Sequence, residues 1–254
     1  MHGSFAATTG QGIAAVRRWG RETALATRDV PVVAVNRAIG FGFDRLFDAS
    51  PLREVQSFYQ QVGNARWFLE CSPQAGIDYA SLERAGGRVG GSVIKLVGDL
   101  EAAVAYPGPT VEVAIATKED ASEFMAIVGV QLGVPELARP GIVAPIELPG
   151  WTYYVALEDG NAVAGAAMFV SGVGSWLGLA GTLPAYRHRG AQTSLLTRRL
   201  QDARRAGCLW TSAETSPETV DRNPSLHNMK RVGLYELYQR PWMRFDEHPS
   251  RPSA

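Results

Sequence analysis

The sequence predicts a mixed fold of class α+β, or α/β, built from two lobes along its 254 residues. Segments in which apolar and polar residues alternate, typical of strands, take turns with segments in which apolar residues recur every third or fourth position, typical of helices. The same order of segments occurs twice. Residues 106–110 (YPGPT) separate the two copies, because prolines and glycine continue neither a helix nor a strand. We therefore expect lobes at 1–105 and 106–254, each a twisted mixed sheet flanked by helices.

In the first lobe, Ser50 and Pro51 mark the start of a helix, because serine caps a first turn and proline suits its first position. Gly63 ends that helix. Residues 36–44 (NRAIGFGFD) are punctuated by glycine and predict a loop or a bulged strand. The lobe is expected to contain helices at 11–26, 51–62 and 77–85 and strands at 31–35, 65–71 and 92–97.

In the second lobe, Thr117 with Asp120 resembles a capping box for a helix that ends at Gly133. Residues 134–150 contain four prolines and are expected to be irregular, either as a binding loop or as a surface excursion. A hairpin is expected to turn at 158–161 (EDGN). The other expected elements are strands at 111–116, 151–157, 162–170, 176–182, 208–213 and 235–245 and helices at 191–206 and 224–232.

The composition is that of an ordinary globular protein. The formal net charge of +0 and the pI of ≈ 6.9 argue against nucleic-acid and acidic-membrane partners. The two cysteines make no disulfide framework, and we expect reduced core thiols in a cytoplasmic protein. No apolar run approaches the length of a membrane helix, about 18–20 residues. We also expect no secretory signal and no metal site, because neither pattern is present.

The most informative stretch is 180–207, AGTLPAYRHRGAQTSLLTRRLQDARRAG. It predicts the end of a strand, a basic glycine loop (RHRG) and a helix at 191–206 with one apolar stripe. The N-terminus of a helix suits an anion, because it presents N–H groups without intrahelical acceptors and the positive end of the helix dipole. Gly190 lets a ligand approach the backbone, and Arg187 and Arg189 offer guanidinium groups for phosphate oxygens.

This stretch resembles motif A of the GNAT family of acyl-CoA-dependent N-acetyltransferases, whose loop has the pattern Q/R-x-x-G-x-G/A. Arg187, Gly190 and the small Ala191 fit that pattern. Gln192 departs from it, because the family usually has a second small residue there. A βα turn with solvent-facing arginines is the structural alternative. The lack of G-x-G-x-x-G and of a Walker lysine argues against a nucleotide-binding protein.

The resemblance implies that acetyl-CoA binds here as a co-substrate. The backbone of Ala180 and Thr182 would pair with its pantetheine arm, and the amides of 189–193 would hold its pyrophosphate. Three polar residues at the start of the last helix would lie near the cofactor, although helix capping is an alternative explanation for them. The predicted cofactor-binding residues are Ala180, Gly181, Thr182, Leu183, Arg187, His188, Arg189, Gly190, Ala191, Gln192, Thr193, Asn223, Ser225 and Asn228.

Both halves follow the order strand and glycine loop, helix, strand, helix, strand, at 32–97 and 176–245. Because side-chain identity between the halves is low, this pattern alone suggests two GNAT-like lobes. Where the second half has its basic loop, the first has residues 48–51 (DASP), and Asp48 would repel a pyrophosphate. We therefore expect a degenerate first lobe that binds no cofactor.

The chemistry of such an enzyme needs a base, because the amine must lose a proton before it attacks the thioester. Glu214 follows the strand at 208–213, which is expected to splay from the strand that ends at Thr182. This position makes Glu214 the candidate base. An exposed glutamate at a strand end, without a catalytic role, is the alternative.

The acid is less clear from the sequence. Many GNAT enzymes have a tyrosine that protonates the departing thiolate, and this chain has Met229 at that position, four residues before Gly233. His227 is the second candidate catalytic residue, with a surface or capping role as its alternative. Tyr235 and Tyr238 lie in the terminal strand, where a packing role is expected.

The favoured function is the transfer of an acetyl group from acetyl-CoA to an amine on a small molecule or a peptide. A catalytically silent acyl-CoA-binding or regulatory module is the rival hypothesis, supported by Met229 and the degenerate first lobe. We expect a monomer or a homodimer with no nucleic-acid or membrane partner. The sequence does not identify the acceptor.

Overall fold

The computed structural model describes residues 14–20, 22–28, 33–41, 50–64, 66–71, 73, 76–102, 111–217 and 223–246. The chain forms two compact units, unit 1 with residues 1–93 and 239–254 and unit 2 with residues 94–238. The lobe boundary between 105 and 106 stays a prediction, and its linker, 106–110, lies outside the described residues. Asp48 lies outside them as well.

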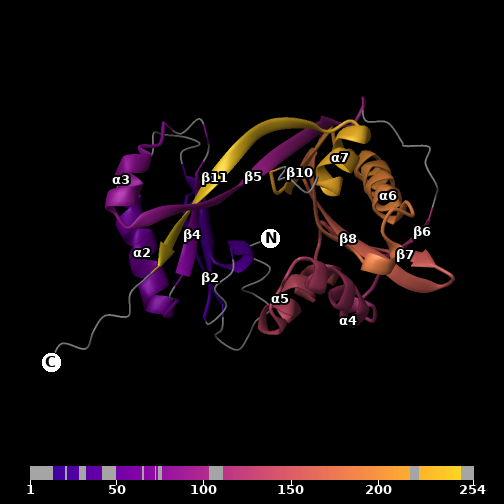
Figure 1. Ribbon diagram of the computed structural model, residues 1–254, viewed down its shortest axis with the longest axis horizontal. Helices are drawn as coiled ribbons and strands as arrows, with labels where there is room; N and C mark the ends of the chain where they lie inside the picture. Colours follow the sequence, from indigo (N-terminus) through magenta and orange to yellow (C-terminus); the bar gives the residue numbers. More distant parts are fainter. Residues whose placement is uncertain are drawn as a thin grey trace. The chain divides into compact units, whose positions relative to one another are not determined.

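Unit 1 is a sheet with the α-helices α2 and α3 on one side (Figure 1). The strand order is β1-β2-β3-β4-β11, and all neighbouring pairs are antiparallel except β3 with β4. Leu52, Val55 and Tyr59 form one buried helix face, as their spacing predicts. The elements are β1 (Ala14–Trp19), β2 (Glu22–Thr27), the 3-10 helix η1 (Val33–Val35), β3 (Arg37–Phe41), α2 (Ser50–Val62), β4 (Arg66–Cys71), α3 (Tyr79–Arg84) and the distal part of β11 (Tyr235–Asp246).

Two predictions for the start of the chain are wrong. Within the described residues from Ala14 on, the expected helix at 11–26 is replaced by a pair of antiparallel strands, because Gly20, at φ +70°, interrupts the segment with a turn and the second strand pairs with β3. The expected strand at 31–35 contains the 3-10 helix η1 instead. The strand forms at β3, with the bulge that the glycines of 36–44 indicated.

The core of unit 1 is an aromatic stack. The ring of Trp67 lies parallel to that of Tyr59, with centroids 4.7 Å apart, and to that of Phe245, 4.2 Å away. On the other face of β4, the buried Glu70 pairs with Arg37 at 3.2 Å and with Arg240 at 2.5 Å.

Unit 2 is a sheet in the order β5-β10-β9-β8-β7-β6, antiparallel except for β9 with β10. Figure 1 shows the two longer helices on one face and α4 and α5 on the other. The strands are the distal part of β5 (Gly87–Asp99), β6 (Glu112–Ala116), β7 (Trp151–Glu158), β8 (Asn161–Ser171), β9 (Gly174–Thr182) and β10 (Trp210–Thr215). The longer helices are α6 (Ala191–Arg205) and α7 (Pro224–Arg231).

The segment expected to be irregular, 134–150, is mostly helical. It contains the short helices η4 (Glu136–Ala138), α5 (Arg139–Val143) and η5 (Ala144–Glu147). Two of its prolines lie in the first turns of α5 and η5, where a missing N–H costs nothing, so they start helices rather than prevent them. The preceding helix is α4 (Ala121–Phe124), which continues as a π-helical turn, η3 (Met125–Gly129).

The repeated order of elements is present. Each half contains a parallel strand–helix–strand crossover, β3–α2–β4 in unit 1 and β9–α6–β10 in unit 2. In each unit the second strand of this pair has an antiparallel neighbour that comes from the other half of the sequence. β11 pairs with β4, and β5 pairs with β10. Among the described residues, no helix is both long enough and apolar enough to cross a membrane.

Candidate functional site

The parallel pairing of β9 with β10 ends before either strand does. The register runs from Trp210 opposite Gly174 to Ala213 opposite Leu177. Glu214 then continues to pair with β5, whereas β9 continues to pair with β8. The two strands therefore part at their carboxyl ends, as the sequence predicted for this pair.

A β-bulge lies in β9 directly after the last residue that pairs with β10. Gly165 is opposite Gly181 and Ala167 is opposite Gly178, so one residue of β8 faces two residues of β9. Within the bulge, Leu179 has a φ of +49°, a conformation that side chains other than glycine rarely adopt. Leu179 and Ala180 thus share one opposing residue of β8, and the regular ladder is interrupted beside the parting strands.

The helical segment that contains η3 lies very close to the sheet at this point. A Cβ atom on Gly165 would lie 2.8 Å from Cγ2 of Val128, and one on Gly181 would lie 2.9 Å from Cβ of Gln131. Both contacts are shorter than real Cβ contacts. The two glycines, which face each other across β8 and β9, therefore permit the close approach of this segment.

The basic loop leads from the 3-10 turn η6 (Pro184–Tyr186) into α6. His188 has a φ of +63°, and Gly190, the N-cap of α6, has a φ of +93° and caps with no side chain. The first N–H to bond within the helix is that of Ser194, which donates to the Gly190 carbonyl at 2.9 Å. The amides of 191–193 thus have no intrahelical acceptor and suit an anion.

Both loop arginines make exposed contacts. Nη2 of Arg187 donates to Oε1 of Gln131 at 2.6 Å, and Nη1 of Arg189 lies 2.6 Å from Oε1 of Glu158. Arg189 also lies over the ring of Tyr186, 5.2 Å from its centroid. Exposed pairs contribute only about 0–1 kcal/mol, so both guanidinium groups can exchange these partners for phosphate oxygens.

Hydrogen bonds link the first turn of α6 to α7. Gln192 donates from Nε2 to Oγ of Ser225 at 3.2 Å and accepts at Oε1 from Nδ2 of Asn228 at 2.8 Å. Asn223 caps α7, because its Oδ1 accepts from the amide of Leu226 at 3.1 Å, as the capping alternative predicted. The residue that departs from the family pattern is thus the one that joins two predicted parts of the site.

Glu214 has a partner that the sequence analysis missed. Its Oε1 lies 3.4 Å from Nζ of Lys95, the residue opposite it on β5, and both side chains are about four-fifths buried (19% and 20% exposed). Lys95 carries no local signal, since only the pairing of β5 with β10 brings it here. The contact holds the carboxylate one residue past Ala213, the last residue of β10 that pairs with β9.

The residues considered for the acid differ from Glu214 in their exposure to solvent. His227 is exposed, on the side of α7 away from the two residues that contact Gln192. Met229 is 6% exposed and packs in the core of unit 2, so a core role accounts for its apolar side chain. Tyr235 is 59% exposed.

Thiol and metal chemistry find little support in the part of the chain that the structure describes. Cys71 and Cys208 are free and buried, and burial raises the pKa of both thiols, that of Cys71 to about 12. No group of three or more metal-ligating side chains occurs among the described residues.

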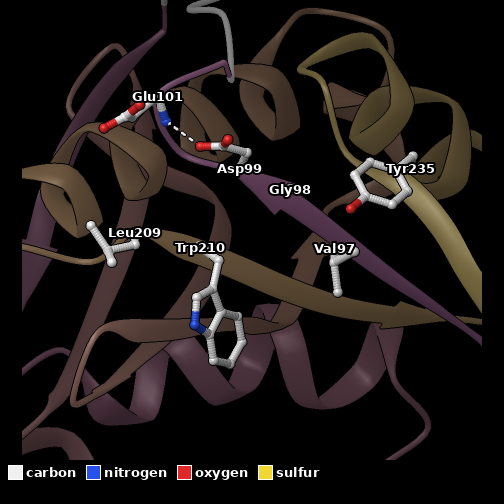
Figure 2. Close-up of a pocket in the computed structure, with 7 residues that line it drawn as sticks. All are labelled: Val97, Gly98, Asp99, Glu101, Leu209, Trp210 and Tyr235. Carbon is white, nitrogen blue, oxygen red and sulfur yellow. Dashed lines mark hydrogen bonds between the residues drawn. The ribbon is translucent and has the colours of Figure 1, made fainter.

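A pocket of about 500 Å³ lies at the opposite end of β10 (Figure 2). Trp210 and Val97 point to the same side of the paired strands there, and the Glu101 amide donates to Oδ1 of Asp99 at 2.8 Å. None of the predicted cofactor-binding residues lines it, and neither does Glu214 or His227. Its lining residues are Val97, Gly98, Asp99, Glu101, Leu209, Trp210 and Tyr235.

Comparison with known proteins identifies the fold. No protein-family model and no curated protein matches the sequence. Among solved structures, a GCN5-related N-acetyltransferase from Kribbella flavida aligns with a TM-score of 0.69 at 18% identity, covering 98% of this chain and 96% of that one. A GCN5-related N-acetyltransferase from Sphaerobacter thermophilus aligns with a TM-score of 0.64 at 14% identity, covering 92% and 84%.

A tandem GNAT protein from the clavulanic acid biosynthesis pathway aligns with a TM-score of 0.63 at 13% identity, covering 94% of this chain and 85% of that one. All three identities are low, so the likeness concerns the fold. The chain has the GNAT fold over nearly its full length, with the mixed sheet and flanking helices that its sequence predicts.

Proposed function

We propose that this chain is an N-acetyltransferase that binds acetyl-CoA in unit 2 and acetylates an amine on a small molecule or a peptide. One observation carries the proposal. Strand β9 parts from β10 before β10 ends. The loop after β9 contains two arginines and leads into the glycine-capped N-terminus of α6. The GNAT fold gives this combination its interpretation.

The described residues suit the cofactor. The amides of 191–193 and the exposed Arg187 and Arg189 would hold its pyrophosphate, since charge-assisted hydrogen bonds to phosphate are strong. The carbonyl of Ala180 and the backbone of Thr182 would pair with the pantetheine arm, which leaves the Ala180 amide available to the thioester carbonyl. Gly190 has no Cβ to block the approach.

Glu214 is the proposed base. Its carboxylate, held by Lys95, would accept a proton from the attacking ammonium, directly or through one water. Acetyl-CoA supplies a thioester whose carbonyl carbon the amine attacks, with cleavage of the carbon–sulfur bond. Backbone N–H groups of the bulge at Leu179 and Ala180 would stabilise the negative charge that develops on the carbonyl oxygen.

Met229 cannot donate a proton in place of the usual tyrosine. A CoA thiolate is a fair leaving group, because ordinary thiol pKa values are about 8.5, and water can protonate it. Loss of a general acid costs about 10²–10⁴-fold in rate. We therefore expect slow acetyl transfer rather than none.

Turnover of acetyl-CoA with a panel of amines tests the proposal. Release of CoA that depends on the amine, together with an acetylated product of the expected mass, would support it. The rival, a silent acyl-CoA-binding module, is favoured by the burial of Met229 in the core. Binding of acetyl-CoA without turnover across the whole panel would support the rival instead.

A further inference from the structure

Arg199 is an unusual buried cation in the middle of α6. Its side chain is only 2% exposed and lies in the apolar stripe of the helix, with Leu195, Leu196 and Ala203. Its guanidinium makes no ion pair with any carboxylate in the described part of unit 2. All its recorded hydrogen bonds go to main-chain carbonyl oxygens.

These carbonyl oxygens lie at the bulge of β9. Nη1 of Arg199 donates to the carbonyl of Ala167 at 3.1 Å and to that of Gly178 at 3.4 Å, while Nε donates to the Leu195 carbonyl of its own helix at 3.0 Å. Ala167 and Gly178 are the opposed pair that closes the regular ladder just before Leu179. One side chain therefore ties α6 to both strands at the point where β9 leaves its regular path.

This arrangement is costly and specific. Burial lowers the pKa of Arg199 to about 10, which still leaves the group charged at neutral pH. A well-packed apolar residue would serve stability at least as well, because a buried charge loses its hydration. A planar fork that reaches two carbonyls from one rigid helix does what an apolar residue cannot, because it holds the carbonyl just before the strained Leu179 together with the one opposite it on β8.

We propose that Arg199 is a positioning residue for acetyl transfer, which holds the β9 bulge so that the amides of Leu179 and Ala180 face the thioester carbonyl. The inference rests on the proposed function. The bulge amides act on charge that develops during reaction rather than on the bound cofactor. Loss of Arg199 should therefore lower kcat and leave the affinity for acetyl-CoA nearly unchanged.

The test compares Arg199→Lys and Arg199→Met with Leu200→Ala, a control in the same helix that opens the core at a 3% exposed side chain. Three quantities are measured for each folded variant: kcat, the dissociation constant of acetyl-CoA, and hydrogen exchange of residues 177–182. For both Arg199 variants we expect kcat to fall about 10²-fold, as for a lost oxyanion donor, with affinity within about twofold and faster exchange in this segment. Leu200→Ala should lower the melting temperature with kcat kept within about threefold.

A wild-type kcat in folded Arg199→Lys would overturn the proposal, as would unchanged exchange at 177–182. An equal loss of kcat in Leu200→Ala would show a structural role only. If neither Arg199→Lys nor Arg199→Met folds, Arg199→Gln replaces them, because it is neutral and keeps a side-chain N–H donor. A wild-type kcat in folded Arg199→Gln would then overturn the proposal.

The failure of the proposed function can be told apart from the failure of this inference. If wild-type protein releases no CoA with any amine, acetyl transfer is refuted and Arg199 has no catalytic part to play. Hydrogen exchange then still reports whether Arg199 holds the bulge. If wild type turns over and Arg199→Lys does so equally well, only the role of Arg199 is refuted.

Discussion

The two parallel crossovers of this chain have the same connectivity and differ at the ends of their strands. In unit 1 the pairing of β3 with β4 reaches Phe41 opposite Cys71, the last residue of each strand. In unit 2 the pairing of β9 with β10 stops at Ala213, two residues before β10 ends. The same topology therefore gives a closed pair in one unit and an open pair in the other.

The residues around each pair account for the difference. In unit 1 the core beside β4 is occupied by the stacked rings of Tyr59, Trp67 and Phe245. In unit 2 a bulge with a strained Leu179 diverts β9, and α6 starts at a glycine behind two arginines. Among the described residues, which leave out 42–49 before α2, the features proposed for an anion and thioester site occur in the second crossover.

The largest expected effect concerns the base. Glu214→Gln should lower kcat by about 10²–10⁴-fold, because the amide cannot accept the proton from the amine. Glu236→Gln is a matched control, because Glu236 also pairs with a lysine of unit 2, Lys230, at 2.5 Å. Glu236 belongs to neither β9 nor β10, the two strands that part. Steady-state rates with the best amine decide the matter, and equal rates for Glu214→Gln and wild type would exclude this residue as the base.

Gly190→Val should weaken acetyl-CoA binding by about tenfold or more, the equivalent of one lost charge-assisted hydrogen bond, because Cβ would separate the backbone from the pyrophosphate. Gly63→Val in unit 1 is the matched control. Gly63 also has a positive φ, +76°, and has open space around the position of a Cβ atom. Both variants carry backbone strain, so calorimetry should find weaker binding only for Gly190→Val; equal losses would refute the loop assignment.

The sequence predicts some residues of the proposed site and not others. The loop at 187–190 and α6 could be predicted because their signals are local: a strand, a glycine that starts a helix, and an apolar stripe. Lys95 could not, because it meets Glu214 only through the pairing of β5 with β10. The position of Arg199 could have been predicted, because it lies four residues after Leu195 and four before Ala203, on the apolar stripe of α6.

The start of the chain could not be predicted for the same physical reason. Residues 14–27 have a helix-like spacing of apolar residues, but pairing of β2 with β3 overrides that local preference. The burial of Met229 was equally hidden, because only the packed position of α7 places it in the core. Local signals thus predict the anion-binding half of the site, and long-range pairing determines the half with Glu214.

A smaller effect is expected from restoring the usual acid. Met229→Tyr should raise kcat by up to about tenfold at unchanged acetyl-CoA affinity, because the new hydroxyl can protonate the leaving sulfur. This gain is smaller than the usual contribution of a general acid. Because Met229 is 6% exposed, the larger ring should also lower stability by about 1–3 kcal/mol. Rate and thermal unfolding are measured together, with Met229→Phe as the control. A gain of equal size with phenylalanine would rule out proton donation.

The smallest effects should come from the loop arginines. Arg187→Ala and Arg189→Ala should each weaken acetyl-CoA binding about threefold to tenfold and reduce its dependence on salt, because each removes one exposed cation. Arg84→Ala, at a 75% exposed side chain on α3 of unit 1, is the control. Titrations at low and high salt distinguish the outcomes, and the same loss for all three variants would contradict a specific role of the loop.

The most direct test of the central claim, that unit 2 alone keeps the acetyl-CoA site, is the binding stoichiometry of the full chain. Isothermal titration calorimetry should give about one acetyl-CoA per chain, and that binding should be strongly weakened in Gly190→Val and unchanged in Gly63→Val. Two equivalent sites per chain, or a single site that survives Gly190→Val at full affinity, would contradict the account.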